Sequence, residues 1–158
     1  MTHIQKCKKT KFGTEGIFIW NLYDISINVL IDDGVDLEYA DKCVEHLQSL
    51  DADFLLKLYD ASVRYCESCR ADYDDVDVPI EINGIDILRY IEPKLLIIEK
   101  PKSYEPAFHM ECNCSWEEEH GFEFTVRNGK LLYVGSFNDM GPWMNIDRYK
   151  ASWNYAEI

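Results

Sequence analysis

The sequence contains no hydrophobic run long enough to cross a bilayer, which requires about 20 residues. Its longest apolar stretches, such as Leu95 to Ile98, are far shorter. The first residues include lysine but no apolar core behind it, unlike a secretory signal peptide. These absences exclude a membrane-spanning protein, and we expect a cytoplasmic protein with no membrane partner.

Basic residues are scarce, with 16 Lys and Arg against 29 Asp and Glu, for a formal net charge of −13. Such a charge repels nucleic acid phosphates and attracts basic proteins, although it also simply favours solubility. Acidic residues cluster at 32–33, 72–77 and 117–119, whereas lysines concentrate at 6–11. We therefore expect a basic protein as partner and no nucleic acid.

Familiar catalytic motifs are also missing: there is no His-Glu-x-x-His, no Gly-rich phosphate loop and no nucleophile elbow. One alternative remains, in which Glu119 and His120 act as base and orienting residue and Glu117 or Glu118 holds a cation. A structural interpretation of the same segment has Trp116 anchoring a loop and Gly121 permitting its turn. We favour this interpretation and expect no enzymatic activity, no catalytic residues and no cofactor.

Six cysteines are present, and without a secretion signal we do not expect disulfides. Cys66-x-x-Cys69 and Cys112-x-Cys114, with histidines nearby, could in principle supply a zinc site. However, the first pair continues the apolar face of a helix, and the second pair points to one side of a strand. We predict that all four are core residues and that none binds metal.

Hydrophobic periodicity predicts strands first, then helices, then strands again. Alternation predicts a strand over 23–31, and helical spacing predicts helices over 37–50 and, after the N-cap Asp51, up to about residue 73. A short third helix is expected over 85–91. The order predicts a single α+β domain over residues 1–158, with an antiparallel sheet and two to three helices packed on one face.

A β-hairpin is expected at Asn128-Gly129, between strands over 122–127 and 130–135. Its two-residue turn predicts Val126 opposite Leu131 and Phe124 opposite Tyr133. We also expect the aromatic C-terminal tail to be packed; its aromatic residues are Trp143, Trp153 and Tyr155.

The segment from Trp116 to Phe122 reads Trp-Glu-Glu-Glu-His-Gly-Phe and precedes the hairpin. It resembles the mark of a bacterial domain family of unknown function: Trp, Asp or Glu, any residue, Glu, His, Gly, then Leu or similar. The similarity extends over roughly residues 50–140, with Phe122 where leucine is commoner. Domains of this kind resemble small acidic proteins encoded beside bacterial toxins. The resemblance implies an immunity protein, and it brings no catalytic residues.

We therefore hypothesise an acidic immunity protein that neutralises a cognate bacterial toxin by covering its basic active site, for example that of a nuclease-type domain. Since loops often carry function, the expected partner-binding residues are Asp72, Asp74, Asp75, Asp77, Glu117 and Glu118. Two alternatives stay open. One is a metal-dependent or acid/base hydrolase using the Glu119–His120 region, and the other is a homo-oligomeric structural protein formed through a strand edge or the aromatic tail.

Overall fold

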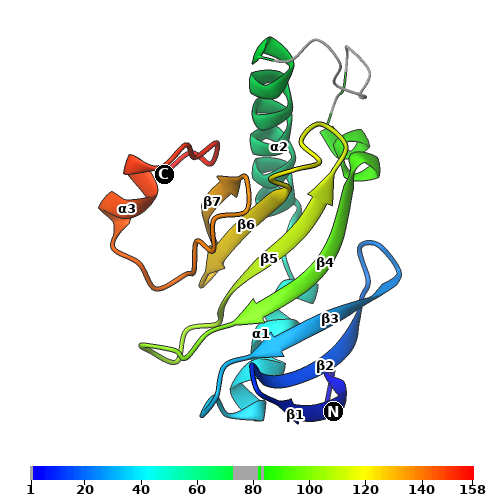
Figure 1. Ribbon diagram of the computed structural model, residues 1–158, viewed down its shortest axis with the longest axis vertical. Coiled ribbons are helices and arrows are strands. Elements are labelled where there is room, and N and C mark those ends of the chain that lie inside the picture. The colour runs from blue at the N-terminus through cyan, green and yellow to red at the C-terminus, as the bar shows by residue number, and fades with distance from the viewer. Residues whose placement is uncertain (1, 73–81, 83) are drawn as a thin grey trace.

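A seven-stranded sheet forms the centre of the computed structural model, which describes residues 2–72, 82 and 84–158 (Figure 1). The strands follow the chain in spatial order: β1 Gln5–Thr10, β2 Gly13–Trp20, β3 Ile25–Ile31, β4 Ile91–Ile98, β5 Ala107–Cys114, β6 Phe122–Arg127 and β7 Lys130–Gly135. All neighbouring pairs are antiparallel except β3 and β4. The predicted α+β class is confirmed.

The parallel pair follows from what connects it. A parallel pair needs a long crossover connection, and here α1 (Leu37–Gln48), α2 (Ala52–Asp72) and the 3₁₀ helix η1 (Gly84–Tyr90) lie between β3 and β4. The short third helix expected over 85–91 is present as the 3₁₀ helix η1. Among the described residues, no helix is both long enough and apolar enough to cross a membrane.

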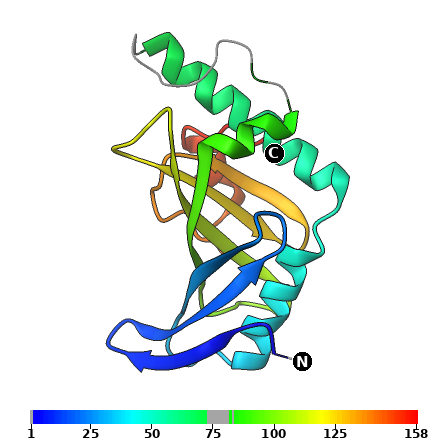
Figure 2. The same ribbon diagram turned by 90° about the vertical axis from the view of Figure 1, so that its right-hand side faces the viewer.

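Helices α1 and α2 lie on the same side of the sheet (Figure 2). Most of the residues that helical spacing places on their buried faces are buried, including Val44 and Leu47 of α1 and Tyr65 of α2. Leu55 was expected in the core but is only partly buried, and Tyr59 is buried although it was not expected to be. The carboxylate of Asp51 accepts a hydrogen bond from the Phe54 amide at 2.8 Å, as expected for an N-cap. Local sequence thus specified both helices and the face that each one buries.

The hairpin forms at Asn128-Gly129, and both residues have positive φ, at 49° and 76°. Val126 pairs with Leu131 as predicted, but the predicted pair of Phe124 with Tyr133 is wrong. A bulge between Thr125 and Val126 shifts the register, so Phe124 faces Val134 and Thr125 faces Tyr133. The extra residue turns Tyr133 away from the main core and onto the opposite face of the sheet.

That opposite face has a small cluster of its own, built on β6 and β7. Helix α3 (Ile146–Ala151) contributes Tyr149, which packs with Leu132, Tyr133 and Met140. One face of the sheet therefore carries α1 and α2, and the other carries α3 and the segment that leads into it.

The two edges of the sheet are protected in different ways. β1, which hydrophobic periodicity does not reveal, is exposed and rich in lysine, a composition that discourages pairing with other chains. The β7 edge is covered by the C-terminal tail: Asn154 bonds both Leu132 and Val134, and the Tyr155 amide donates to the Val134 carbonyl. Tyr155 also stacks on Tyr65. The tail is packed there as expected, but the prediction is wrong for Trp153, which is 85% exposed.

Candidate functional site

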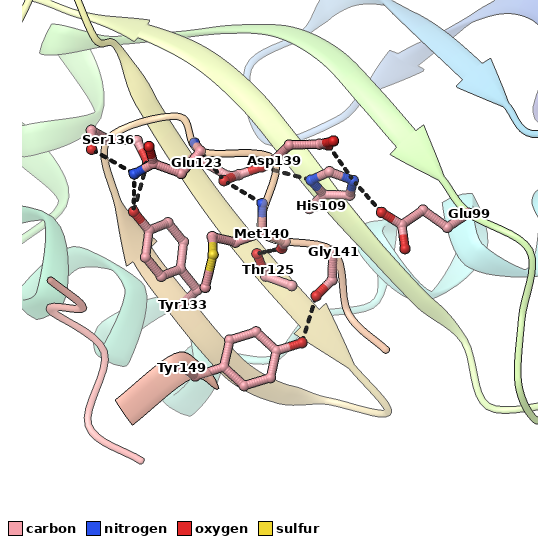
Figure 3. Close-up of polar contacts among 11 residues, drawn as sticks. Glu99, His109, Glu123, Thr125, Tyr133, Ser136, Asp139, Met140, Gly141 and Tyr149 are labelled. Carbon is pink, nitrogen blue, oxygen red and sulfur yellow. Dashed lines mark hydrogen bonds and ion pairs between the residues drawn. The ribbon is translucent and has the colours of Figure 1, made fainter. Parts of the chain in front are cut away.

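A buried polar cluster lies on the face of the sheet that carries α3 (Figure 3). His109 on β5 and Glu123 and Thr125 on β6 are all fully buried. Each alternates along its strand with apolar residues that face the helices, such as Phe108 and Phe124. Buried polar groups are stable only when they have partners, so the contacts of this cluster define what it can do.

Glu123 organises the cluster. Its Oε2 lies 2.6 Å from His109 Nδ1, and both side chains are inaccessible to solvent. Its Oε1 accepts hydrogen bonds from the backbone amides of Asn138 at 3.2 Å and Met140 at 3.0 Å. One carboxylate thus fixes the histidine ring and also holds the loop that crosses over it.

The other ring nitrogen of His109 faces two further carboxylates. Nε2 lies 3.3 Å from Glu99 Oε1 and 3.8 Å from Asp139 Oδ1, yet it is buried and has no hydrogen-bond partner. Burial lowers the pKa of His109, but the hydrogen bond to Glu123, the close contact of Nε2 with Glu99 and the charges of both carboxylates outweigh this and raise it to about 9.

Backbone conformation brings these carboxylates close to the ring. Asp139 has a φ of 54°, in the left-handed region that few residues other than glycine adopt. A Cβ atom at Gly141 would overlap both carboxylate oxygens of Glu99, so only glycine allows this approach. Thr125 Oγ1 donates to the Met140 carbonyl at 2.6 Å, and the Tyr149 hydroxyl donates to the Gly141 carbonyl. The loop is therefore held on several sides.

Sequence reasoning missed this cluster. Along β5 and β6, alternation places His109, Glu123 and Thr125 opposite the apolar residues, and such positions usually face solvent. Two features of the sequence could have indicated the cluster. One is the presence of polar residues at alternate positions of two neighbouring strands, and the other is the Asn-Asp-Met-Gly-Pro segment at 138–142 that follows the hairpin. That these residues lie together becomes clear only once the strand register is known.

The predicted partner-binding carboxylates have different surroundings. Asp72 is the exposed last residue of α2, and Glu118 is exposed in the β5–β6 loop. Asp74, Asp75 and Asp77 lie outside the described residues.

Glu117, in contrast, takes part in the structure of the β5–β6 loop. Its Oε1 accepts hydrogen bonds from the amides of Glu119 and His120, both at 3.2 Å. Trp116 is buried against Tyr65, and Gly121 has a φ of 67°. The structural interpretation of Trp116 and Gly121 is confirmed.

The fold brings Asp72 and the acidic residues 117–119 to one end of the molecule. Figure 1 shows the C-terminal end of α2 and the β5–β6 loop at this end, and β1 at the other. The buried thiol of Cys69 reports this proximity, since its pKa is raised to about 11 by burial first and then by the charges of Glu117, Cys66 and Asp72. We call Asp72, Glu117, Glu118 and Glu119 the acidic end.

The hydrolase alternative gains one contact in this loop, between His120 and Glu117, but it lies at an exposed histidine. His120 is 60% exposed, and its Nδ1 lies 3.3 Å from Glu117 rather than beside the carboxylate of Glu119. A separate cavity of about 930 Å³ lies between the start of α1 and the β4–β5 loop, lined by Glu38, Lys42, Lys102 and others. Its lining contains no histidine or cysteine.

The four cysteines of the two close pairs lie in the main core, as predicted. Burial raises the pKa of Cys114 to about 12, which favours the neutral thiol. Within the part of the chain that the structure describes, the group of three potential metal ligands is instead Glu99, His109 and Asp139.

These features define an α+β domain with a mostly antiparallel sheet, an acidic end and a buried histidine–carboxylate cluster. Residues 4–141 match the family described as Domain of unknown function (DUF6985), and the chain belongs to that family. No curated protein and no solved structure matches the chain. The expected membership of a family of unknown function is confirmed at this level.

Proposed function

We propose that this protein binds a basic protein through its acidic end, and that it acts as an immunity protein by covering the basic active site of a cognate bacterial toxin. The observation that carries the proposal is the location of Asp72, at the end of α2, and of the acidic β5–β6 loop at one end of the fold, away from the lysines of β1 (Figure 1). Asp74, Asp75 and Asp77, which we expect to contact the partner as well, follow Asp72 and Tyr73 in the sequence and lie outside the described residues.

The proposal predicts how binding depends on charge. Exposed carboxylates contribute little to affinity one by one, but together they steer a basic partner and raise its association rate by roughly 10- to 1,000-fold. The lysines of β1 at the far end make the charge distribution asymmetric, which favours one approach direction. Screening by salt should then slow association sharply.

The test uses the toxin domain encoded beside this gene, purified as the binding probe. Its association rate is measured by biolayer interferometry at 50 and 300 mM NaCl. We expect the rate to fall at the higher salt, and to fall about tenfold at low salt in the triple variant Asp72→Asn, Glu118→Gln, Glu119→Gln. The wild-type chain should also protect cells that express the toxin.

A matched control neutralises as many carboxylates elsewhere: Glu15→Gln, Glu45→Gln and Asp147→Asn, all exposed. We expect its association rate to change less than about twofold at the same salt. Equal slowing in both triple variants would show that only total charge matters. Absence of binding, together with absence of protection, would reject the immunity function.

A further inference from the structure

We propose that Glu99, His109 and Asp139 bind one divalent transition-metal ion, of the zinc or manganese type. This inference is independent of the proposed function, since the site is formed by the residue after β4, by β5 and by the loop after β7, apart from the acidic end. Figure 3 shows the two carboxylates converging on one edge of the His109 ring.

The first support is a buried nitrogen that faces two carboxylates without a hydrogen bond to either. His109 is fully buried, and its Nε2 makes only ion-pair contacts, at 3.3 Å to Glu99 and 3.8 Å to Asp139. A buried polar atom without a hydrogen bond costs about 1–3 kcal/mol. A metal ion between Nε2 and the carboxylates would displace the proton of Nε2 and bind the nitrogen and both carboxylates directly.

The second support is spacing. The three ligand atoms lie within 4.8 Å of one another. Two ligands about 2.1 Å from a tetrahedral ion are about 3.4 Å apart, close to the 3.3 Å and 3.8 Å that separate Nε2 from Glu99 and Asp139.

The third support is the arrangement behind the ligands. Metal-binding histidines commonly donate their other ring N–H to a carboxylate, which fixes the ring and its tautomer, and Glu123 occupies that position at 2.6 Å from Nδ1. Glu123 also bonds the amides on both sides of Asp139. Gly141 leaves the space that Glu99 fills. The ligands are thus held in place by the fold.

Ligand chemistry selects the class of ion. One imidazole nitrogen with two carboxylate oxygens suits zinc or manganese, whereas calcium and magnesium prefer oxygen ligands alone. The Asp139 side chain is 73% exposed and that of Glu99 is 30% exposed. Solvent can therefore supply the remaining ligands.

The test is binding of Mn²⁺ and Zn²⁺ to the untagged, EDTA-treated full chain, with Mn²⁺ followed by electron paramagnetic resonance and Zn²⁺ by calorimetry. We expect one ion per chain, and at least tenfold weaker binding in Glu99→Gln and in Asp139→Asn. These variants are preferred because His109 is buried and its replacement endangers folding.

Asp24→Asn is the matched control, since Asp24 is also exposed and also has a positive φ, of 52°. It should bind metal as the wild type does. The proposal is overturned if neither ion binds at 100 times the protein concentration, if the three variants bind alike, or if Mg²⁺ or Ca²⁺ binds more tightly. Circular dichroism confirms that each variant is folded before its affinity is compared.

Discussion

The two faces of the sheet are buried by different means. On the face toward α1 and α2, β5 and β6 present apolar side chains, such as Met110 and Phe124, to a large hydrophobic core. On the other face the same strands present His109, Glu123 and Thr125 to a loop. One face is held by hydrophobic burial, which is non-directional. The other combines a small hydrophobic cluster with hydrogen bonds and ion pairs, which require specific geometry.

This difference separates stability from binding chemistry. Apolar burial tolerates substitutions that conserve volume, whereas a buried polar network is destabilised when any one member loses its partner. The polar face also carries the chemistry that could bind an ion, while the acidic end is built on exposed loop and helix termini. The two faces should therefore differ in how strongly substitutions lower the free energy of unfolding.

The largest effect is expected for Glu123→Ala. This change leaves the His109 ring and two loop amides without their acceptor, and breaking a buried ion pair costs about 3–5 kcal/mol. Urea unfolding at pH 7 measures the loss. The double variant Glu123→Ala, His109→Leu should lose less than the sum of the two single changes, because the uncompensated charge is gone. Additive losses would show that the pair is not coupled.

The next effect is a pH dependence that originates on the polar face. Because the pKa of His109 is raised to about 9 in the folded state, from an ordinary value of about 6.5, the protonated ring stabilises the fold fully below about pH 6.5. That contribution declines as the pH rises toward 9. In EDTA, the free energy of unfolding should fall between pH 6.5 and 8, below the range in which the buried thiols titrate. The slope should be flatter in His109→Gln.

A smaller effect is expected from exchanging the chemistry of two neighbours on β6. Thr125→Val removes the hydrogen bond to the Met140 carbonyl, and Val126→Thr puts a hydroxyl into the apolar core, where Val126 is fully buried. The two residues have nearly the same shape, yet each change should destabilise the fold by about 1–3 kcal/mol. Thermal and urea unfolding measure both. A negligible loss for Thr125→Val would mean that the polar face accepts an apolar side chain, and a negligible loss for Val126→Thr would mean that the apolar core accepts a hydroxyl.

The sequence revealed the helix-covered face more fully than the polar one. Helical spacing and the Asp51 cap are local signals, so α1 and α2 were found with their buried faces. β1 was missed because its residues are polar on both sides. The bulge between Thr125 and Val126 changed the partner of Tyr133, and no glycine or proline in the sequence indicates its position.

The site on the polar face could not be assembled from the sequence. Glu99, His109, Glu123 and Asp139 come from four separate segments, and only the strand register and the loop after β7 bring them together. The acidic runs were visible in the sequence, but the common location of Asp72 and residues 117–119 at one end depended on the fold. Local patterns therefore predicted elements, and long-range contacts decided the candidate site.

The smallest effect is expected on the helix-covered side, at the cap that the sequence disclosed. Asp51→Ala removes the acceptor for the Phe54 amide at the start of α2 and should lower the free energy of unfolding by about 1 kcal/mol. Asp51→Asn keeps a side-chain oxygen in place and serves as the control, with a loss near zero. Urea unfolding resolves the two variants. An equal loss in both would assign the effect to charge at the helix N-terminus, and a loss as large as that of Glu123→Ala would remove the distinction between local and networked polar contacts.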